Sequence, residues 1–450
     1  MNVRRVNSLM AVIMVASVAA GCSAAYLSAG GNALFALGAA VAPALAAGTI
    51  EPSILVVAAL ASSAATGGLS SLSLPFVQIS LGGVVTGVLA CTSALSLAVH
   101  RKRVTRSLLR SFAPFLLFVG WSLVRAVGTP APIDAIKDVG LFAAPVLIGL
   151  AAGVAAKRKA SLRRSLGSLV WGVSAVPVLG VLGGIGLGFV QLTPLGLRGP
   201  FGTRTLALFL LVVLCVSLSW SRFERRCPVK SAWLVWTGLT VGVLVATLSR
   251  TALVTSVALA SVALVQPRRL SQWVLAAVLV ALLVLALLQV PEFRARFFFA
   301  DGGELVDLLN PEKVNTMGRA YLWPIVLRSA LESPLIGNGT GSARALVSSV
   351  SSLDHPHNDY LRVLHDLGIV GLGLLLLGWG GRVRHHWLSW LSTGRRDIRV
   401  ARLHMAACLS GIGLTVSFVT DNTLVYTFVT TPVFVLFAVA DSWSQGGSDR

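Results

Sequence analysis

Charged residues are scarce in this sequence of 450 residues, at 12%, while 55% of the residues are hydrophobic. Soluble domains carry about 25% charged residues, so this scarcity argues against a soluble globular fold. Apolar stretches of about 18 to 25 residues recur along nearly the whole chain, each long enough to cross a hydrocarbon core. Together with the mean hydropathy of +0.81, they predict an all-α polytopic membrane protein. A β-barrel is disfavoured, because barrel strands alternate in polarity and these stretches do not.

Cysteine is also rare. The five cysteines, Cys22, Cys91, Cys215, Cys227 and Cys408, form no C-x-x-C motif. The cysteines therefore imply neither a disulfide framework nor a cysteine-based zinc site. Cys22 ends a stretch that resembles a bacterial lipoprotein signal, MNVRRVNSLMAVIMVASVAAGC. Because another apolar segment follows almost at once, we interpret this stretch as a first transmembrane helix.

Long polar segments are missing too, apart from residues 291–358. The apolar stretches predict about 14 spans, or about 12 if residues 33–50 and 53–67 form a re-entrant hairpin. They divide the chain into an N-terminal transmembrane region of about 11 spans (1–290), an outer loop (291–358) and a C-terminal region of about three spans (359–450). The predicted spans are 9–29, 33–50, 53–67, 75–99, 108–127, 139–156, 166–190, 205–221, 231–248, 251–266, 271–290, 359–380, 402–420 and 423–441.

The predicted inside loops are too short to contain a nucleotide-binding domain. This argues against an ATP-driven transporter subunit and against an enzyme that uses a cytosolic nucleotide sugar. Within the outer loop, the aromatic, aliphatic and basic residues of 319–337 predict a short helix at the membrane–water boundary. Loops as long as 291–358 are more often functional than idle.

The net charge of +20 reflects 37 Lys and Arg against 17 Asp and Glu. The basic residues gather in short loops of one parity, which is typical of the cytoplasmic side of a membrane. We therefore expect both termini to be cytoplasmic. We also expect the basic loops to face the lipids of the bilayer and the protein to bind no nucleic acid. The predicted inside loops are 100–106, 157–164, 222–230, 267–269 and 382–402.

Two glycine-rich segments resemble phosphate-binding loops. GNGTGS (337–342) has no preceding strand and no lysine, so we interpret it as a flexible turn. Its backbone N–H groups nevertheless suit an anion, as in glycine-rich nests. GGIGLG (183–188) lies within a predicted span and is typical of close helix packing by small residues.

Polar side chains gather at the predicted outer helix ends. Ionisable residues at membrane depth are costly and usually face a cavity or a partner. Arg362 and Asp366 are four residues apart and form a predicted ion pair on one helix face. Arg250 and Arg319 have no local acid, which indicates an anionic ligand, because the guanidinium fork suits phosphate oxygens. The other outer polar residues are Arg198, Arg204, His355, His357, Asp359, His365, Asp421 and Asn422.

His357 stands apart from the neighbouring histidines. It directly precedes Asn358 and Asp359, either of which can cap the following helix. The positive end of that helix favours a neutral imidazole that can accept a proton. His365 is interpreted as a hydrogen-bonded packing residue and His355 as a bystander. The H-x-H spacing of His355 and His357 matches no specific zinc pattern, and we expect no metal there.

Four segments together resemble the bacterial O-antigen ligase and O-antigen (exopolysaccharide) polymerase superfamily, over residues 196 to 440. They are HNDYLRVLHDLGIVGL (357–372), SRTAL (249–253), GRAYLWPIVLRSALESPLIGNGTGS (318–342) and RGPFGTRTLA (198–207). Two departures stand out. Asp366 occupies a position where the family typically has Glu, and Arg204 interrupts a segment that is often rich in Asn and Pro.

The resemblance implies a metal-independent, inverting glycosyltransferase of the multi-span type, with no cofactor. Its donor would be a glycan on a polyprenyl (undecaprenyl) diphosphate, and its acceptor a glycan or lipid-core hydroxyl. The reaction would take place on the outer face of the bacterial cytoplasmic membrane. By the same resemblance, Arg250 and Arg319 would bind the diphosphate and His357 would activate the acceptor hydroxyl. Arg198, Asp366 and Asp421 are candidate supporting residues.

The sequence leaves other activities open. A ligase moves a finished glycan to a different acceptor, whereas a polymerase joins repeat units, and no motif separates the two. A secondary transporter or flippase would need charged or broken helices near the bilayer midplane, often in inverted repeats. We find no such repeat, and the polar residues lie at the predicted outer surface.

Overall fold

The computed structural model describes residues 81–156, 202–264, 318–393 and 397–445, with short pieces between 178 and 198 and single positions at 60 and between 274 and 291. The predicted spans 9–29 and 33–50, the basic segments 157–164 and 267–269, and Cys22 lie outside the described residues. Spans 53–67, 166–190 and 271–290 are represented only by isolated positions or short pieces.

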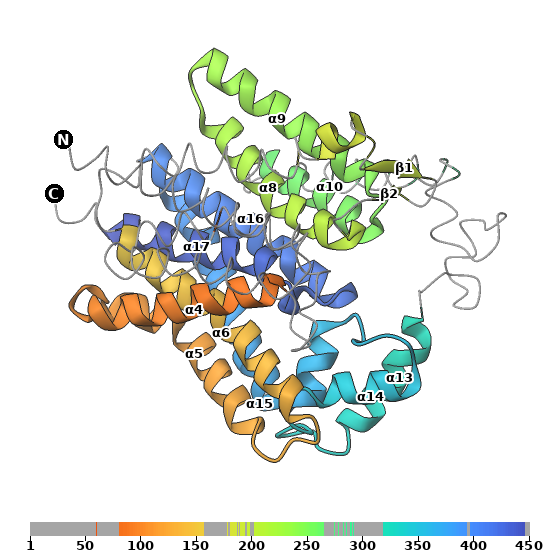
Figure 1. The fold of residues 1–450 in the computed structure, drawn as a ribbon. Coiled ribbons are helices and arrows are strands. Elements are labelled where there is room, and N and C mark those ends of the chain that lie inside the picture. The colour runs from red at the N-terminus through yellow and green to blue at the C-terminus, as the bar shows by residue number, and fades with distance from the viewer. Residues whose placement is uncertain are drawn as a thin grey trace, which may run out of the picture.

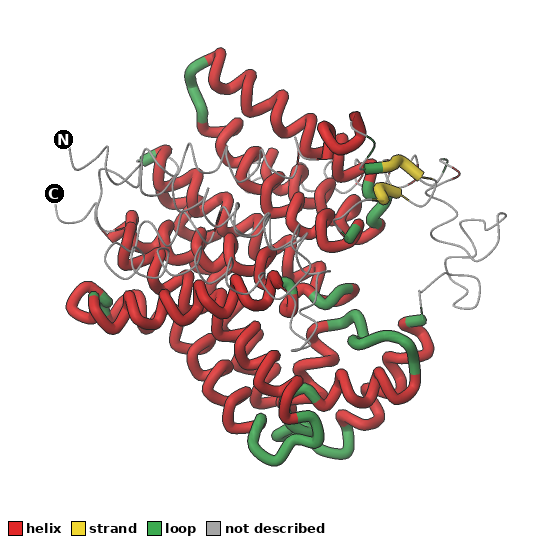
Figure 2. Tube along the Cα trace, in the orientation of Figure 1, coloured by secondary structure: helices red, strands yellow, loops and turns green. Residues whose placement is uncertain are grey.

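Helices form nearly all of the described chain, and short loops connect them (Figures 1 and 2). The 3-10 helices are η1 (Arg101–Arg103) and η3 (Thr423–Val425), and the strands β1 (Gln191–Thr193) and β2 (Gly196–Arg198) pair antiparallel. The α-helices are α4 (Leu81–Val99), α5 (Arg106–Arg125), α6 (Pro132–Ala156), α8 (Thr203–Phe223), α9 (Cys227–Ala246), α10 (Arg250–Leu264), α13 (Arg319–Ala330), α14 (Ser342–Val350), α15 (Asp359–Thr393), α16 (Ile398–Thr420) and α17 (Thr427–Gln445).

The protein is an all-α polytopic membrane protein, as predicted. Within the described residues, 7 helices are long and apolar enough to cross a membrane: α5, α6, α8, α9, α15, α16 and α17. Along α17, 94% of the apolar window is buried, against 28% along α5 and α9. Thus α17 lies inside the bundle, while α5 and α9 present apolar side chains outward, where lipid can cover them.

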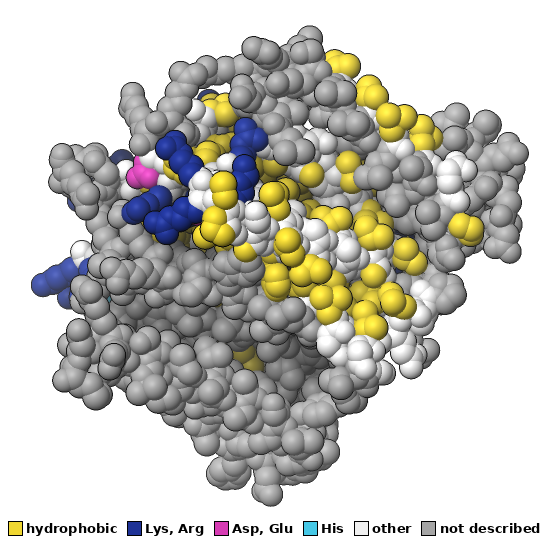
Figure 3. Space-filling model, turned by 90° about the horizontal axis from the view of Figure 1, so that it is seen from above, with side chains coloured by type: hydrophobic (Ala, Val, Ile, Leu, Met, Phe, Trp, Pro, Cys, Tyr) yellow, Lys and Arg dark blue, Asp and Glu magenta, His cyan; other side chains and the backbone are white. Residues whose placement is uncertain are grey.

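The centre of the bundle is aromatic. Trp379 of α15 contacts Phe115, Phe418, Phe434 and Phe437 edge to face, which joins α5, α15, α16 and α17. Such ring pairs add about 0.5–1.5 kcal/mol each beyond the area that they bury. The outer surface has a different character. Figure 3 shows hydrophobic side chains spread over one face, with Lys and Arg gathered toward one end of it.

One predicted boundary is wrong. Residues 382–402 were expected to form a cytoplasmic loop, but α15 continues as a helix to Thr393 and α16 begins at Ile398. Polar residues such as Arg382 and His386 ended the apolar stretch in the sequence. In the fold both are buried, with Arg382 bonded to Asp441 of α17 and His386 to His404 of α16, so they do not end the helix.

A kink in α15 brings its backbone against residues 334–336, which directly precede the GNGTGS segment. Gly368 has φ 66°, and next to it the amides of Ile369 and Val370 donate to the carbonyls of Pro334 and Leu335. A Cβ on Gly368 would collide with the Leu335 carbonyl. The kink therefore depends on glycine both for its backbone conformation and for this close approach.

Replacing Gly368 with alanine is expected to destabilise the protein by at least about 2 kcal/mol, because positive φ and overpacking act together. Thermal unfolding of the detergent-solubilised protein measures the loss as a lower Tm. Gly373 on the same helix is the matched control, since a Cβ there would meet nothing within 4 Å. Gly373→Ala should leave the Tm unchanged or raise it, and an equal fall in both variants would contradict this account of the kink.

Candidate functional site

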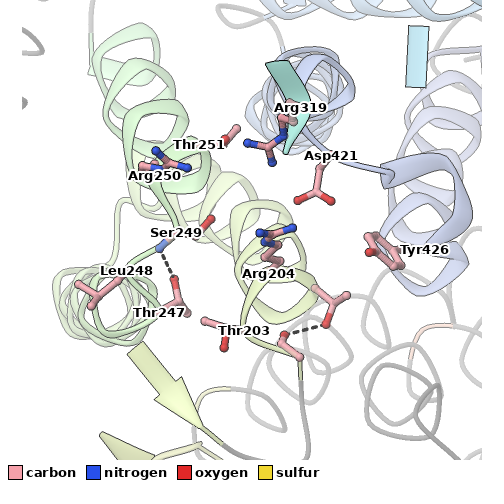
Figure 4. A pocket seen from close by; sticks show the side chains of 12 residues that line it. Thr203, Arg204, Thr247, Leu248, Ser249, Arg250, Thr251, Arg319, Asp421 and Tyr426 are labelled. Carbon is pink, nitrogen blue, oxygen red and sulfur yellow. Dashed lines mark hydrogen bonds between the residues drawn. The ribbon is translucent and has the colours of Figure 1, made fainter. Parts of the chain in front are cut away.

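A pocket of about 480 Å³ opens between the starts of α8, α10 and α13 and the turn that joins α16 to α17. Figure 4 shows Arg204, Arg250 and Arg319 around this pocket, with Asp421 between Arg204 and Arg319. The lining residues are Gly202, Thr203, Arg204, Thr205, Thr247, Leu248, Ser249, Arg250, Thr251, Arg319, Asp421 and Tyr426.

The three arginines share one unusual position. Arg250 and Arg319 are the first residues of α10 and α13, and Arg204 is the second residue of α8. A helix N-terminus carries about half a positive charge, so a cation there is disfavoured. None of the three helices has an acidic residue in its first turn to offset this. The pocket therefore concentrates positive charge, which costs stability but suits an anionic ligand.

Arg319 is held by its neighbours while part of its guanidinium remains unpaired. Its Nη2 donates to the Thr420 carbonyl at 2.6 Å, and the hydroxyls of Thr420 and Thr251 lie 2.8 Å apart. These contacts tie α10, α13 and α16 together beside the pocket. The Nε atom of Arg319 is buried without a hydrogen bond to any described residue. Burial, and then the neighbouring Arg204, lowers the pKa of Arg319, while Asp421 opposes the shift.

The pocket also contains neutral hydrogen-bond donors. Ser249 contributes a hydroxyl group to its lining, whereas the hydroxyls of Thr203 and Thr205 already donate to the carbonyls of Leu197 and Gly202. Burial raises the pKa of the Tyr426 phenol, with Asp421 acting in the same direction. The phenol consequently stays protonated at neutral pH and can donate a hydrogen bond.

Backbone strain marks this end of the molecule. Among the described residues, Leu248 and His357 are the non-glycine residues with positive φ, at 50° and 54°. Such conformations cost of order 1–3 kcal/mol and tend to cluster at functional sites. Leu248 lies in the pocket lining, two residues before the start of α10. The short connection between α9 and α10, residues 247–249, is thus strained.

His357 is linked to the pocket through the α16–α17 turn. Its Nδ1 lies 3.0 Å from Asn422 Nδ2 and 3.8 Å from Asp421 Oδ1. Both contacts of the ring use Nδ1, and Nε2 has no hydrogen bond to any described residue. The imidazole is therefore oriented from one side, through a carboxylate that itself lines the pocket.

The start of α15 holds His357 in place. Asn358 caps the helix by accepting a hydrogen bond from the Leu361 amide at 3.0 Å, as one of the two predicted caps. Asp359 instead accepts from the Leu424 amide at 2.9 Å, on the turn that carries Asp421 and Asn422. The two segments that flank the imidazole are thus bonded to each other.

Arg362 contacts two carboxylates, and the predicted partner Asp366 is the more distant of them. Arg362 Nη2 forms a short ion pair with Asp138 of α6, while its Nε lies 3.9 Å from Asp366 Oδ2. The side chains of Arg362 and Asp138 are fully buried. Arg362 is therefore a structural link between α15 and α6, a partner that lies 224 positions away in the sequence.

Asp366 does not line the pocket. Its carboxylate accepts hydrogen bonds from the amides of Gly341 and Ala343, at 3.2 and 2.7 Å, and from the Ser342 hydroxyl at 3.0 Å. The amides at the GNGTGS segment thus do bind an anion, but this anion is the protein's own carboxylate. We conclude that Asp366 positions α14.

The remaining histidines of this region have structural partners. His365 contacts the hydroxyls of Ser342 and Ser329, each at 3.2 Å, which agrees with the predicted packing role. His355 Nε2 lies 3.0 Å from Arg344 Nη2. Burial, followed by Arg362 and Arg344, lowers the pKa of His355 well below its ordinary value, so it stays neutral.

The predicted residue Arg198 ends β2, and its side chain is not among those that the structure describes. Arg204, six residues further along the chain, lines the pocket. From the sequence it stood out as one of the outer polar residues and as a departure from the family pattern. Its place at the start of a helix was the available signal, as it was for Arg250 and Arg319.

Comparison with known proteins supports one family. Residues 237–376 match the family model of the O-antigen ligases. The matched segment contains Arg250, Arg319 and His357, whereas Arg204, Asp421 and Tyr426 lie outside it. No curated protein matches the chain.

Proposed function

We propose, from the match of residues 237–376 to the O-antigen ligase family model, that this protein transfers a glycan from a polyprenyl diphosphate to an acceptor hydroxyl. The family consists of glycosyltransferase-like ligases and polymerases that use lipid-linked glycans in a membrane. The observation that carries the proposal is the pocket on which three arginines converge, each from the start of a different helix.

The pocket suits a diphosphate. Guanidinium groups bind phosphate oxygens with two parallel hydrogen bonds, and three of them can offset the charge of a diphosphate. The helix N-termini add partial positive charge and backbone amides. Its volume of about 480 Å³ falls in the range of small-molecule sites, about 300–1,000 Å³. Asp421 partly offsets the charge of Arg319 before the donor binds.

The reaction is a single displacement at the anomeric carbon of the donor glycan. The acceptor oxygen forms a bond to that carbon while the bond from the carbon to the diphosphate oxygen breaks. The bonding electrons leave with the diphosphate, and Arg250 and Arg319 stabilise the charge that grows there. The acceptor proton passes to His357. Such a displacement inverts the anomeric configuration and needs no metal or nucleotide, because arginines hold the leaving group.

His357 requires a defined tautomer for this role. If Nε2 is to accept the proton, Nδ1 must carry its own hydrogen toward an acceptor. On that side of the ring Asp421 Oδ1 lies 3.8 Å away, and a 180° turn of the Asn422 amide presents to Nδ1–H its buried Oδ1, which has no hydrogen-bond partner among the described residues. Asp421 also stabilises the imidazolium that forms, which couples the base to the pocket.

The orientation follows from charge. The basic segments at 100–106 and 222–230 and the basic start of α16 lie at the helix ends away from the pocket, which supports a cytoplasmic side there. We therefore place the pocket on the outer face of a bacterial cytoplasmic membrane, with both termini in the cytoplasm. The polyprenyl chain would lie between helices in the bilayer.

Replacing Arg204 with alanine is expected to raise the KM for the lipid-linked donor about tenfold, with a smaller effect on kcat. One of three charges that hold the diphosphate is then lost, and a charge-assisted hydrogen bond contributes about 1.5–3 kcal/mol. Arg225, exposed beyond the other end of α8, is the matched control, and Arg225→Ala should leave KM unchanged. An unchanged KM in Arg204→Ala would contradict a donor-binding role for Arg204.

In vitro transfer tests the proposed function directly. The purified chain in liposomes, supplied with a polyprenyl diphosphate-linked glycan, an acceptor and a chelator, should form a new glycosidic bond without nucleotide. A product extended by repeat units indicates the polymerase activity, and a single transfer to a lipid core indicates the ligase activity. Movement of the lipid-linked glycan across the bilayer without bond formation would indicate a flippase and contradict the proposal.

A further inference from the structure

A second polar cluster lies far from the pocket, near the other end of α15. It comprises His385 and His386 of α15, His404 of α16 and Asp441 of α17. His386 and His404 are fully buried, and Asp441 is nearly so. Along α15, His385 follows Asp359 by 26 positions, roughly 40 Å at 1.5 Å per residue. The proposed transfer reaction uses none of these residues.

We propose that His385, His386 and His404 form a binding site for a divalent transition-metal ion of the zinc class. One nitrogen from each imidazole lies within 4.8 Å of the other two. The ring centroids are separated by 5.2, 5.1 and 6.0 Å. Imidazoles bound to one tetrahedral ion, with metal–nitrogen bonds of about 2.0–2.1 Å, have centroids about 5 Å apart. Small side-chain movements therefore bring all three rings onto one ion.

Neighbouring groups supply the support that a histidine metal site requires. A metal-bound histidine almost always donates its other N–H to an oxygen. His404 Nε2 lies 2.6 Å from the Ser444 hydroxyl, which leaves its Nδ1 for an ion. The Nδ1 of His386 lies 2.8 Å from that atom. Asp441 Oδ1 is 3.1 Å from His385 Nε2, so this carboxylate either supports His385 or is itself the fourth ligand.

The site has an entry path. The His385 side chain is 48% exposed, whereas His386 and His404 have no exposed surface. An ion can therefore reach His385 first and then the two buried rings. Three nitrogens and one carboxylate oxygen suit zinc, cobalt or nickel, whereas magnesium and calcium require oxygen ligands.

Arg382 occupies part of this site when no ion is bound. Its Nη2 donates to Asp441 Oδ1 at 2.6 Å and to His386 Nε2 at 2.7 Å. With an ion on Nδ1, His386 Nε2 must carry a proton and can no longer accept from Arg382. Asp441 Oδ1, now 4.0 Å away, is then the natural acceptor for that proton. Metal binding therefore requires the guanidinium to turn aside, and Arg382 competes with the ion.

An ion at this position would bridge α15, α16 and α17, the helices that also carry His357 and Asp421 at the opposite end. The site is independent of the proposed glycan transfer, since no step of that reaction uses its residues. Binding should stabilise the folded chain in proportion to ion concentration.

Titration of the purified full-length chain in detergent with Co²⁺ and Zn²⁺, after treatment with a chelator, tests the site. We expect one ion per chain, an intense visible absorption of tetrahedral Co²⁺, and displacement of that absorption by Zn²⁺. His385→Ala, at the exposed ligand, should weaken binding at least about tenfold, and His404→Ala more strongly. His100→Ala, a histidine outside the cluster, should bind as the wild type does.

Arg382→Gln separates a metal site from a hydrogen-bonded histidine network. If Arg382 competes with the ion, its replacement should tighten Co²⁺ binding at least about tenfold. If Arg382 only stabilises the fold, its replacement should not tighten Co²⁺ binding. The absence of stoichiometric binding to the wild-type chain would overturn the proposal. Equal affinity in wild type and His385→Ala, or weaker binding in a folded Arg382→Gln chain, would overturn it as well.

Discussion

Replacement of His357 with alanine is expected to lower the rate of glycan transfer by about 10²- to 10⁴-fold, the usual contribution of a positioned general base. The acceptor hydroxyl would then have to lose its proton to water, while donor binding, which depends on the arginines, remains. The measurement is transfer from a polyprenyl diphosphate-linked glycan under saturating donor. The expected change lies in kcat, with the KM for the donor little altered.

The neighbouring His355 provides the control. It lies two residues away on the same segment, but its ring contacts Arg344 and burial keeps it neutral. His355→Gln should therefore transfer at close to the wild-type rate. If His357→Ala is folded and inserted and still works at the wild-type rate, His357 is not the base.

Replacement of Arg319 with alanine should lower kcat/KM for the donor by about 10²- to 10³-fold, as does the loss of one preorganised donor to a developing oxyanion. Its side chain is fixed by the Thr420 carbonyl, and its buried Nε lacks a protein partner. The Arg319 side chain is therefore preorganised for ligand binding. Arg250→Ala should lower kcat/KM by a similar factor. Lysine at either position should restore part of the activity, because it supplies a positive charge but not the two parallel N–H donors of a guanidinium group.

The same helix offers a matched control for Arg319. Arg328 lies on α13 as well, but it is exposed and does not line the pocket. Arg328→Ala should keep full activity and the same expression. Equal losses in Arg319→Ala and Arg328→Ala would indicate a general charge effect on α13 and would contradict diphosphate binding by Arg319.

The double replacement of Arg250 and Arg319 adds information about their shared role. If both hold the same diphosphate, the combined loss should fall short of the product of the two single losses, because residues that act as a unit are not additive. Transfer rates of the two single variants and the double variant measure this. Independent, fully multiplicative losses would place the arginines on different ligands or at different steps.

Some of the site was accessible from the sequence, for a definite reason. Arg250 and Arg319 stand out because a charged residue beside an apolar stretch is costly without a purpose. His357 stands out because it directly precedes a helix cap. These signals are local, since each depends on the residue and its near neighbours along the chain. The membrane class and the helical fold are local in the same sense, because a single stretch of apolar residues predicts a span.

Contacts between distant segments were not accessible. Asp366 looked like the partner of Arg362, four residues earlier, yet Arg362 pairs with Asp138 and Asp366 binds the amides of the GNGTGS segment. The loop expected at 382–402 is mostly helix, because Asp441 and His404 satisfy its polar residues from other helices. Hydropathy scores a residue by its type and contains no information about such partners.

Alone, the sequence determined that this chain is a helical membrane protein with arginines and a histidine at helix ends, and to which family it is similar. Only the tertiary structure decided that Arg204 joins Arg250 and Arg319 at one pocket, and that Asp421 connects this pocket to His357. It also decided that three histidines from two helices meet at the other end. The physical reason is that the free-energy cost of placing a charged side chain in a membrane can be read from the residue and its neighbours in the sequence. The partner that offsets this cost depends on how the helices pack.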